Sequence, residues 1–256
     1  MAGADRDRPG PMQAAQRAMR PPLPKRFYKT VSVGEEGGAF TVLLDGKAMR
    51  TPAKRLFALP VRALAEIAAR EWDAQQSEID PGTMPMTRLA NLAIDRIAET
   101  ASETAQEVKR YAASDLVLYR AGEPEGLVEE QAKHWDPVLR WADEALDAHF
   151  VLASGVNFVS QPDSSLQTVA KAVDAFAPPF ALAALASVTQ LTGSALIALM
   201  LGHGKIAPVA AWNAAHVDDD WNARTWGEDR EATAKRALRL AEFEAAARML
   251  SCTRAE

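Results

Sequence analysis

Residues 175–204 contain no charged side chain, and this apolar stretch limits the possible folds more than any other part of the sequence. A stretch of this length is long enough to span a bilayer as a single helix. However, Thr192-Gly193-Ser194 divides it into two apolar pieces, each too short to cross the hydrocarbon core. Helices that are apolar on every side lie in protein cores. The stretch therefore predicts a pair of buried helices over 179–202 and no stable membrane insertion.

The chain before this stretch begins with a strand pattern. Residues 27–33 are rich in β-branched and aromatic residues with partial alternation, and further candidate strand runs occupy 40–44, 47–50 and 56–59. Asp45-Gly46 supplies the positive φ angles of a tight hairpin turn between the second and third runs. We therefore expect a small antiparallel meander of four strands.

From Pro60 onward the apolar residues recur at helical spacing. Pro60 suits a helix start because its missing N–H costs nothing there, and Thr87 can cap the next helix. Pro137 is expected to interrupt a later helix, since it removes a backbone donor and clashes with the preceding turn. The predicted helices cover 60–76, 87–97, 103–113, 127–150, 164–176, the pair over 179–202, 206–226 and 228–250.

These patterns predict an α+β fold, with a small antiparallel β-meander domain followed by a larger all-helical domain. Three parts are expected: a disordered basic and proline-rich tail over 1–25, a β-rich domain with one helix over 26–86, and a helical domain over 87–256. Residues 1–26 contain six basic and two acidic side chains and lack the apolar segment of a secretory signal. The prolines, Asp5 and Asp7 disfavour a mitochondrial presequence, which stays a minority alternative.

Charge and cysteine content exclude several classes of protein. The chain has 34 acidic and 29 basic residues, so its formal net charge is -5. Dedicated nucleic-acid binders usually carry a basic excess, and we therefore expect no nucleic-acid partner. The one cysteine, Cys252, excludes an intramolecular disulfide and a thiolate metal cluster, which favours a reducing compartment.

Signatures of catalysis are missing from the sequence. We find no G-x-S-x-G elbow around a serine, no H-x-x-x-H pair and no complete Walker loop. His216 and Asp220 would share a helix face, but two ligands are too few for a metal site. We therefore expect no catalytic residue, no metal and no cofactor, and a protein that is not an enzyme.

The segment 216–231 holds six acidic and two basic residues, interleaved with Trp221 and Trp226. Tryptophan is costly on a surface unless it packs or binds something. The two tryptophans are five residues apart and fall on different helix faces, so at least one is expected near solvent. They are either core anchors within a solvated acidic face or part of a recognition patch. In such a patch, tryptophan would supply binding energy and the acids would steer a basic partner.

Several blocks of the sequence, taken in order from about Arg26 to Leu250, carry a family resemblance. The main blocks are Leu44-Asp45-Gly46-Lys47, Glu71-Trp72-Asp73-Ala74-Gln75, Met84-Pro85-Met86-Thr87-Arg88-Leu89-Ala90-Asn91, Trp135-Asp136-Pro137, Leu191-Thr192-Gly193-Ser194 and Trp226-Gly227-Glu228-Asp229. In these blocks the chain resembles the assembly chaperones that bind the alpha subunit of the F-type ATP synthase catalytic head.

The resemblance implies a molecular chaperone that holds the unassembled alpha subunit until it pairs with a beta subunit. An isolated subunit exposes a large apolar interface, and such a surface drives aggregation. The resemblance also implies a monomer located in the cytoplasm of an alphaproteobacterium, with the mitochondrial matrix as the alternative. Two other functions are weighed against it: an enzyme with a hidden acidic pocket, and a membrane-surface scaffold whose basic tail binds anionic lipid.

The family is expected to depend on an acidic residue of its helical domain, which falls at Asp218 or Asp219 in this sequence. Family members often carry glutamate there, whereas this chain has three consecutive aspartates. Trp72 and Trp135 are expected to be structural. The predicted partner-binding residues are Asp218, Asp219, Asp220, Trp221, Trp226 and Glu228.

Overall fold

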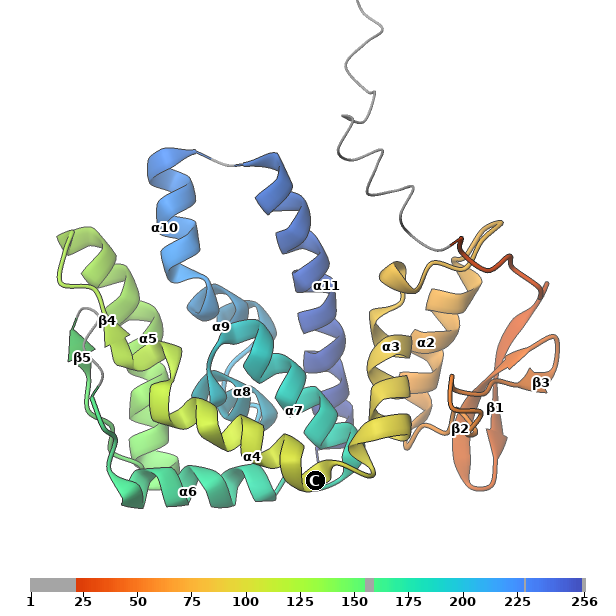
Figure 1. The fold of residues 1–256 in the computed structure, drawn as a ribbon, viewed down its shortest axis with the longest axis horizontal. Coiled ribbons are helices and arrows are strands. Elements are labelled where there is room, and N and C mark those ends of the chain that lie inside the picture. The colour runs from red at the N-terminus through yellow and green to blue at the C-terminus, as the bar shows by residue number, and fades with distance from the viewer. Residues whose placement is uncertain (1–21, 155–158, 228, 255–256) are drawn as a thin grey trace, which may run out of the picture.

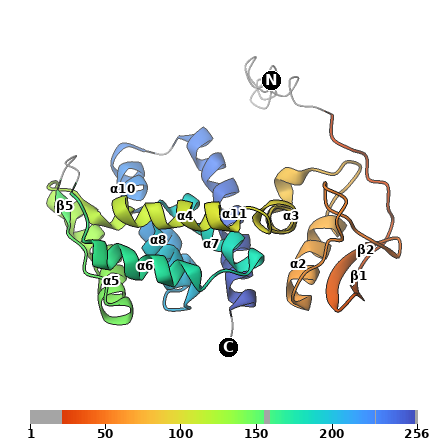
Figure 2. The same ribbon diagram turned by 60° about the horizontal axis from the view of Figure 1, so that its bottom comes forward.

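A computed structural model of the chain describes residues 22–154, 159–227 and 229–254. The predicted tail, except for residues 22–25, and the predicted site residue Glu228 lie outside these ranges. The molecule is elongated, with a small sheet at one end and a body of helices at the other (Figure 1, Figure 2). A three-stranded antiparallel sheet precedes a mostly helical region, which confirms the predicted fold class.

The elements of the N-terminal part are β1 (Val31–Glu36), β2 (Ala39–Leu44), β3 (Lys47–Ala48), α2 (Arg62–Asp73), the 3-10 turn η1 (Pro81–Thr83), α3 (Pro85–Leu92) and the π-helical turn η2 (Ala93–Ile97). The helical body contains α4 (Ala101–Tyr111), the turns η3 (Ala112–Ser114) and η4 (Leu116–Leu118), α5 (Glu125–Leu146), α6 (Asp163–Asp174), α7 (Pro179–Thr192), α8 (Ala195–Gly202), α9 (Pro208–Ala215), α10 (Val217–Trp226) and α11 (Arg230–Thr253). Two short parallel strands, β4 (Tyr119–Arg120) and β5 (Ala153–Ser154), join two loops of this body and were not predicted.

The sheet is built around the predicted hairpin turn. Asp45 and Gly46 have φ angles of 49° and 76°, and Leu44 pairs with Lys47 across the turn. Positive φ at both positions is the conformation that an Asp-Gly turn favours. The predicted fourth strand is wrong: residues 56–59 form only isolated bridges to Arg50 and Phe40. A turn over residues 51–55 separates them from β3, so no continuous ladder forms.

The predicted buried helix pair is confirmed. Gly193, at a φ of 69°, ends α7, and the side chain of Ser194 caps α8 by accepting a hydrogen bond from the Ile197 amide. Every residue of α8 is buried. The pair packs between α4, α5 and α11, where its apolar surface is covered. Within the described ranges, no helix has the length and hydropathy needed to cross a membrane.

Two predicted helix boundaries are wrong. Pro137 lies inside α5 without ending it, because Pro137 and Lys133 both lie on the exposed face, where water can replace the lost backbone hydrogen bond. The expected helix over 206–226 is divided at His216, whose φ of -123° leaves the helical region. His216 instead packs on Trp212, with ring centroids 3.8 Å apart, so buried aromatic packing takes the place of a helical turn.

Thr87 does not cap its helix, because α3 starts two residues earlier at Pro85. The amide and hydroxyl of Thr87 both donate to the carboxylate of Glu71 on α2, as does the amide of Met86. A side chain from a neighbouring helix therefore takes the place of a local cap.

Candidate functional site

The predicted site lies on a helical arm that projects from the body of the molecule. Helix α10 ends at Trp226 and α11 begins at Arg230, and the upper ends of the two helices project beyond the other helices (Figure 1). The lower half of α11 is anchored by buried side chains such as Phe243, Met249 and Leu250. Its first turns, over residues 231–239, are almost entirely exposed. The arm thus consists of two helices whose ends lack the support of a core.

The three consecutive aspartates of α10 have different surroundings. Asp218 is half-buried and accepts a 2.7 Å hydrogen bond from Nε2 of Gln131 on α5. Asp220 forms an ion pair with Arg236 of α11, which ties the two helices of the arm together. Asp219 is exposed and makes no hydrogen bond or ion pair with the described part of the chain. Of the three carboxylates, Asp219 is therefore the one that is available to a partner.

The two tryptophans also differ. Trp221 is half-buried, and its ring lies so close to α5 that a methyl group at Gly126 would come within 2.6 Å of its Cη2 atom. The guanidinium of Arg224 lies 5.6 Å from the centre of that ring. Trp226, the last residue of α10, is 82 % exposed. Trp221 thus attaches the arm to the body, while Trp226 presents its indole to solvent.

The expected structural tryptophans lie elsewhere. Trp135 is fully buried, and its indole N–H donates to the carbonyl of Ala214 at 2.6 Å. Trp72 is half-buried in the N-terminal part, where its ring packs 5.6 Å from the ring of Tyr28. Neither lines the pockets described next.

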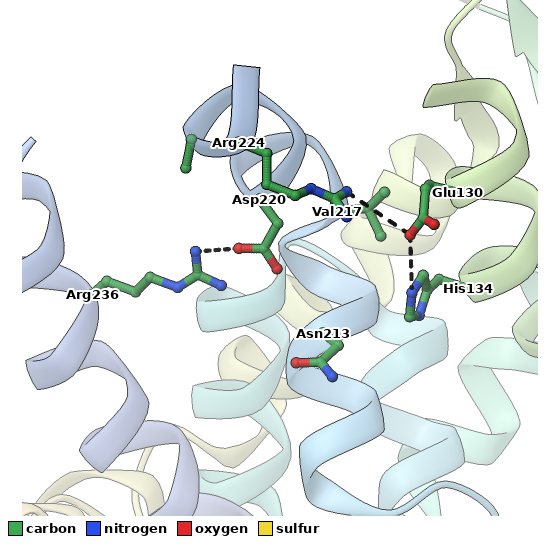
Figure 3. A pocket seen from close by; sticks show the side chains of 8 residues that line it. Glu130, His134, Asn213, Val217, Asp220, Arg224 and Arg236 are labelled. Atoms are coloured by element: carbon green, nitrogen blue, oxygen red, sulfur yellow. Dashed lines mark ion pairs between the residues drawn. The ribbon is translucent and has the colours of Figure 1, made fainter. Parts of the chain in front are cut away.

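A polar pocket of about 380 Å³ is lined by residues of α5, α9, α10 and α11 (Figure 3). Its polar lining comes from four helices and consists of Glu130, His134, Asn213, Asp220, Arg224 and Arg236. The carboxylate of Glu130 lies 3.8 Å from His134 and 4.0 Å from Arg224. Both carboxylates of the pocket are thus near cations, and this ion-pair network joins the arm to the body.

A wider hollow of about 710 Å³ opens between α10 and α11. Asp219 and Trp226 line it from α10, and Lys235 and Arg239 line it from α11. Burial lowers the pKa of His216, which also lines the hollow, so its imidazole is neutral at pH 7. The exposed carboxylate of Asp219 and the exposed indole of Trp226 thus line the same hollow.

Sequence reasoning missed Glu130, Arg224 and Arg236 as neighbours of the predicted acids. Glu130 is far from the segment 216–231 in sequence and lies on α5, so no local pattern indicates it. Arg224 carries one signal, because it follows Asp220 by four residues on the same helix. In the structure, however, Asp220 pairs with Arg236 and Arg224 turns toward Glu130 (Figure 3).

The carboxylates of the pocket are engaged in ion pairs. The pocket carboxylates lie beside guanidinium groups, and the lining contains no serine or cysteine nucleophile. In the described ranges, no group of three or more His, Cys, Asp and Glu side chains could hold a metal ion. Fold and site together define an α+β protein with a charged helical arm that exposes a tryptophan.

Known proteins of the same architecture identify the family. The chain is 46 % identical to the crystal structure of the Atu1473 protein of Agrobacterium tumefaciens, which is proposed to be a chaperone. That match covers 96 % of this chain and 92 % of the other, with a TM-score of 0.85. The crystal structure of Atp12 from Paracoccus denitrificans is 38 % identical, covers 90 % of this chain and 99 % of that one, and gives a TM-score of 0.81.

Sequence comparisons agree with this result. The family model described as ATP12 chaperone protein matches residues 25–143. The mitochondrial protein atp12 of Schizosaccharomyces pombe is 29 % identical over 131 residues, a match that spans 46 % of this chain and 45 % of the yeast protein. The chain belongs to the ATP12 chaperone family, as the sequence blocks predicted.

Proposed function

We propose that the protein is an assembly chaperone that binds the unassembled alpha subunit of the F-type ATP synthase catalytic head. The chaperone prevents aggregation of the alpha subunit until a beta subunit takes the place of the chaperone. Membership of the ATP12 chaperone family, together with similarity to a solved Atp12 over nearly the whole length of that chain, carries this proposal. The chaperone covers an apolar interface, and this task requires no chemical step.

The arm formed by α10 and α11 is the proposed contact region. Asp219 and Trp226 support this assignment, since one carboxylate and one indole are exposed on the same arm. Asp220 and Trp221 contribute by holding the arm in place, and Asp218 does so through Gln131. We retain Glu228 in the proposed contact set because of its place in the sequence between Gly227 and Asp229.

The test is co-expression with the alpha subunit. The wild-type protein should raise the soluble yield of that subunit and co-elute with it as a one-to-one complex, because we propose that the chaperone acts as a monomer. Asp219→Lys should weaken binding by about tenfold or more, since it replaces an attractive charge with a repulsive one. Glu144→Lys, an equal charge change at an exposed position of α5, is the matched control and should bind normally.

Normal binding by Asp219→Lys would contradict the proposed contact region, and the absence of any complex with the wild type would contradict the proposed client. Bacterial relatives support a cytoplasmic location, with the mitochondrial matrix as the alternative. Fractionation of the native host decides between these locations.

A further inference from the structure

A second surface lies at the opposite end of the molecule, in the N-terminal part. A cleft of about 420 Å³ opens where the sheet ends at β3. Its walls include Phe27, Tyr28, Asp45, Lys47, Arg50 and Trp72. None of these residues belongs to the α10–α11 arm, so the cleft is separate from the proposed contact region.

The strand that borders the cleft has an open edge. In the sheet order β1-β2-β3, strand β3 pairs only with β2. Leu44 and Lys47 close the two-residue turn, and the amide of Met49 donates to the carbonyl of Val42 at 2.9 Å. Hydrogen-bonded and non-hydrogen-bonded pairs alternate along an antiparallel ladder, so the N–H and C=O of Ala48 point away from β2. Exposed backbone groups of this kind are a template for an added strand.

Aromatic side chains form the apolar side of the cleft. Phe27 is 72 % exposed and meets the edge of Tyr28, with ring centroids 5.3 Å apart. Trp72 also lines the cleft, and its buried indole N–H has no hydrogen-bond acceptor among the described residues. A large exposed aromatic ring beside a pocket is typical of a surface that binds an apolar side chain.

The rim of the cleft carries more basic than acidic side chains that are free to pair with an occupant. Within the described chain, Lys47 and Arg50 form no ion pair, although Arg50 donates to the carbonyl of Lys54. Asp45 is the only acidic residue in the lining, and it already accepts hydrogen bonds from the amides of Lys29 and Thr30. The rim therefore offers two cations without carboxylate partners, which favours an acidic occupant.

We propose that this cleft binds an extended acidic peptide segment of a partner protein, which adds to β3 through the backbone of Ala48. One apolar side chain of the segment enters between Phe27 and Trp72, and flanking carboxylates meet Lys47 and Arg50. Backbone pairing supplies affinity in this mode of recognition, and the pocket supplies specificity. The chain's own residues 1–21 are a poor occupant, because they carry four arginines and only two aspartates.

The experiment is a titration of the ¹⁵N-labelled full chain, followed by NMR, with the peptide acetyl-Asp-Glu-Val-Leu-Val-Glu-Asp-amide. The expected result is movement of the Ala48 amide and Trp72 indole signals. Lys47→Glu/Arg50→Glu should weaken binding by about tenfold, because two surface ion pairs become repulsive. Ala48→Pro should also weaken it, because proline removes the outward donor without breaking a bond to β2.

The matched control is Lys171→Glu/Arg248→Glu, an equal charge change at two exposed positions of the helical body, which should bind normally. If Ala48→Pro fails to fold, the charge variant and the basic peptide acetyl-Lys-Arg-Val-Leu-Val-Arg-Lys-amide decide the question. The proposal is overturned by unmoved cleft signals, by unchanged affinity in the charge variant or by equal binding of the basic peptide. It is also overturned if the cleft signals move on raising protein concentration alone, because the occupant is then a second copy. None of these outcomes depends on the alpha subunit.

Discussion

Gln131 of α5 fixes Asp218 of α10 in place. Its Nε2 atom donates to Oδ1 of Asp218 at 2.7 Å, while its Oε1 atom accepts a hydrogen bond from the amide of Ala121 at 2.8 Å. Gln131 is buried, so neither contact competes with much water. One of the three aspartates therefore has an internal role, which distinguishes it from its exposed neighbour Asp219.

Gln131→Leu should destabilise the fold. The substitution leaves the carboxylate of Asp218 and the amide of Ala121 without their partner, and a lost buried hydrogen bond of this kind costs about 2 kcal/mol. Urea unfolding measures the change in the free energy of unfolding. Gln106→Leu, at an exposed position of α4, should change it by less than about 0.5 kcal/mol. Equal effects of the two variants would contradict an internal role for Gln131.

Asp115 is expected to make stability depend on pH. This carboxyl group accepts hydrogen bonds from the amides of Val117 and Leu196, but its burial raises its pKa from 3.8 to about 6. Between about pH 4 and pH 6 the folded state therefore binds more protons at this site than the unfolded state. Its contribution to stability is then fully present below about pH 4 and is lost as the pH rises through about 6.

Asp115→Asn removes this titration. The unfolding free energy of the wild type relative to the variant should fall by about 2 kcal/mol from pH 4 to pH 6, and should level off about one pH unit above the pKa of Asp115. Chemical unfolding of both proteins at several pH values measures it. A difference that grows with pH over this range would show that the pKa of Asp115 is lowered instead.

Glu71 holds the first turn of α3 from the neighbouring helix α2. Its carboxylate accepts from the Met86 amide at 2.7 Å, and from the amide and hydroxyl of Thr87 at 2.8 and 2.7 Å. Glu71→Ala should cost about 2 kcal/mol of unfolding free energy, because it removes a helix cap and leaves these donors unpaired. Glu66→Ala, on the same helix and more exposed, is the control for thermal unfolding. Equal losses in the two variants would argue against this cap.

Gly126→Ala should fail to give the usual gain of alanine in a helix. Replacing an unstrained helical glycine stabilises proteins by about 0.5–1 kcal/mol. Here the added methyl would lie 2.6 Å from Cη2 of Trp221, so the indole must move. The smaller ring of Trp221→Phe should restore the gain in the double variant, which a double-mutant cycle of unfolding free energies measures. Additive effects would show that the two residues do not touch.

Local chemistry made several elements predictable. Asp45-Gly46 predicted the hairpin, because few residues accept positive φ, and the uncharged residues 175–204 predicted a buried helix pair. Both features depend on neighbours in sequence. The predicted helix interruption at Pro137 and the predicted strand over 56–59 are wrong because their outcome depends on the surrounding structure. Pro137 is tolerated on an exposed helix face, and residues 56–59 are separated from β3 by a turn.

The candidate site was predictable only in part. The segment 216–231 indicated an acidic region with tryptophans, but it did not distinguish Asp218, Asp219 and Asp220. Their difference arises from Gln131 and Arg236, which lie on other helices. The division of the chain at residues 25 and 86 stays a prediction, and limited proteolysis followed by mass spectrometry would test it.

Trp226→Ala should weaken binding without a loss of stability, whereas Trp221→Ala should lower stability. Trp226 is 82 % exposed, so its loss should change the unfolding free energy by less than about 0.5 kcal/mol. If the arm contacts the alpha subunit, a central tryptophan contributes about 2 kcal/mol, and affinity should fall about thirtyfold. Trp221 packs against α5, and its removal should cost about 2 kcal/mol or more of stability. Calorimetric titration with the alpha subunit and thermal unfolding measure the two effects, and a Trp226→Ala variant that binds normally would place the contact elsewhere on the chain.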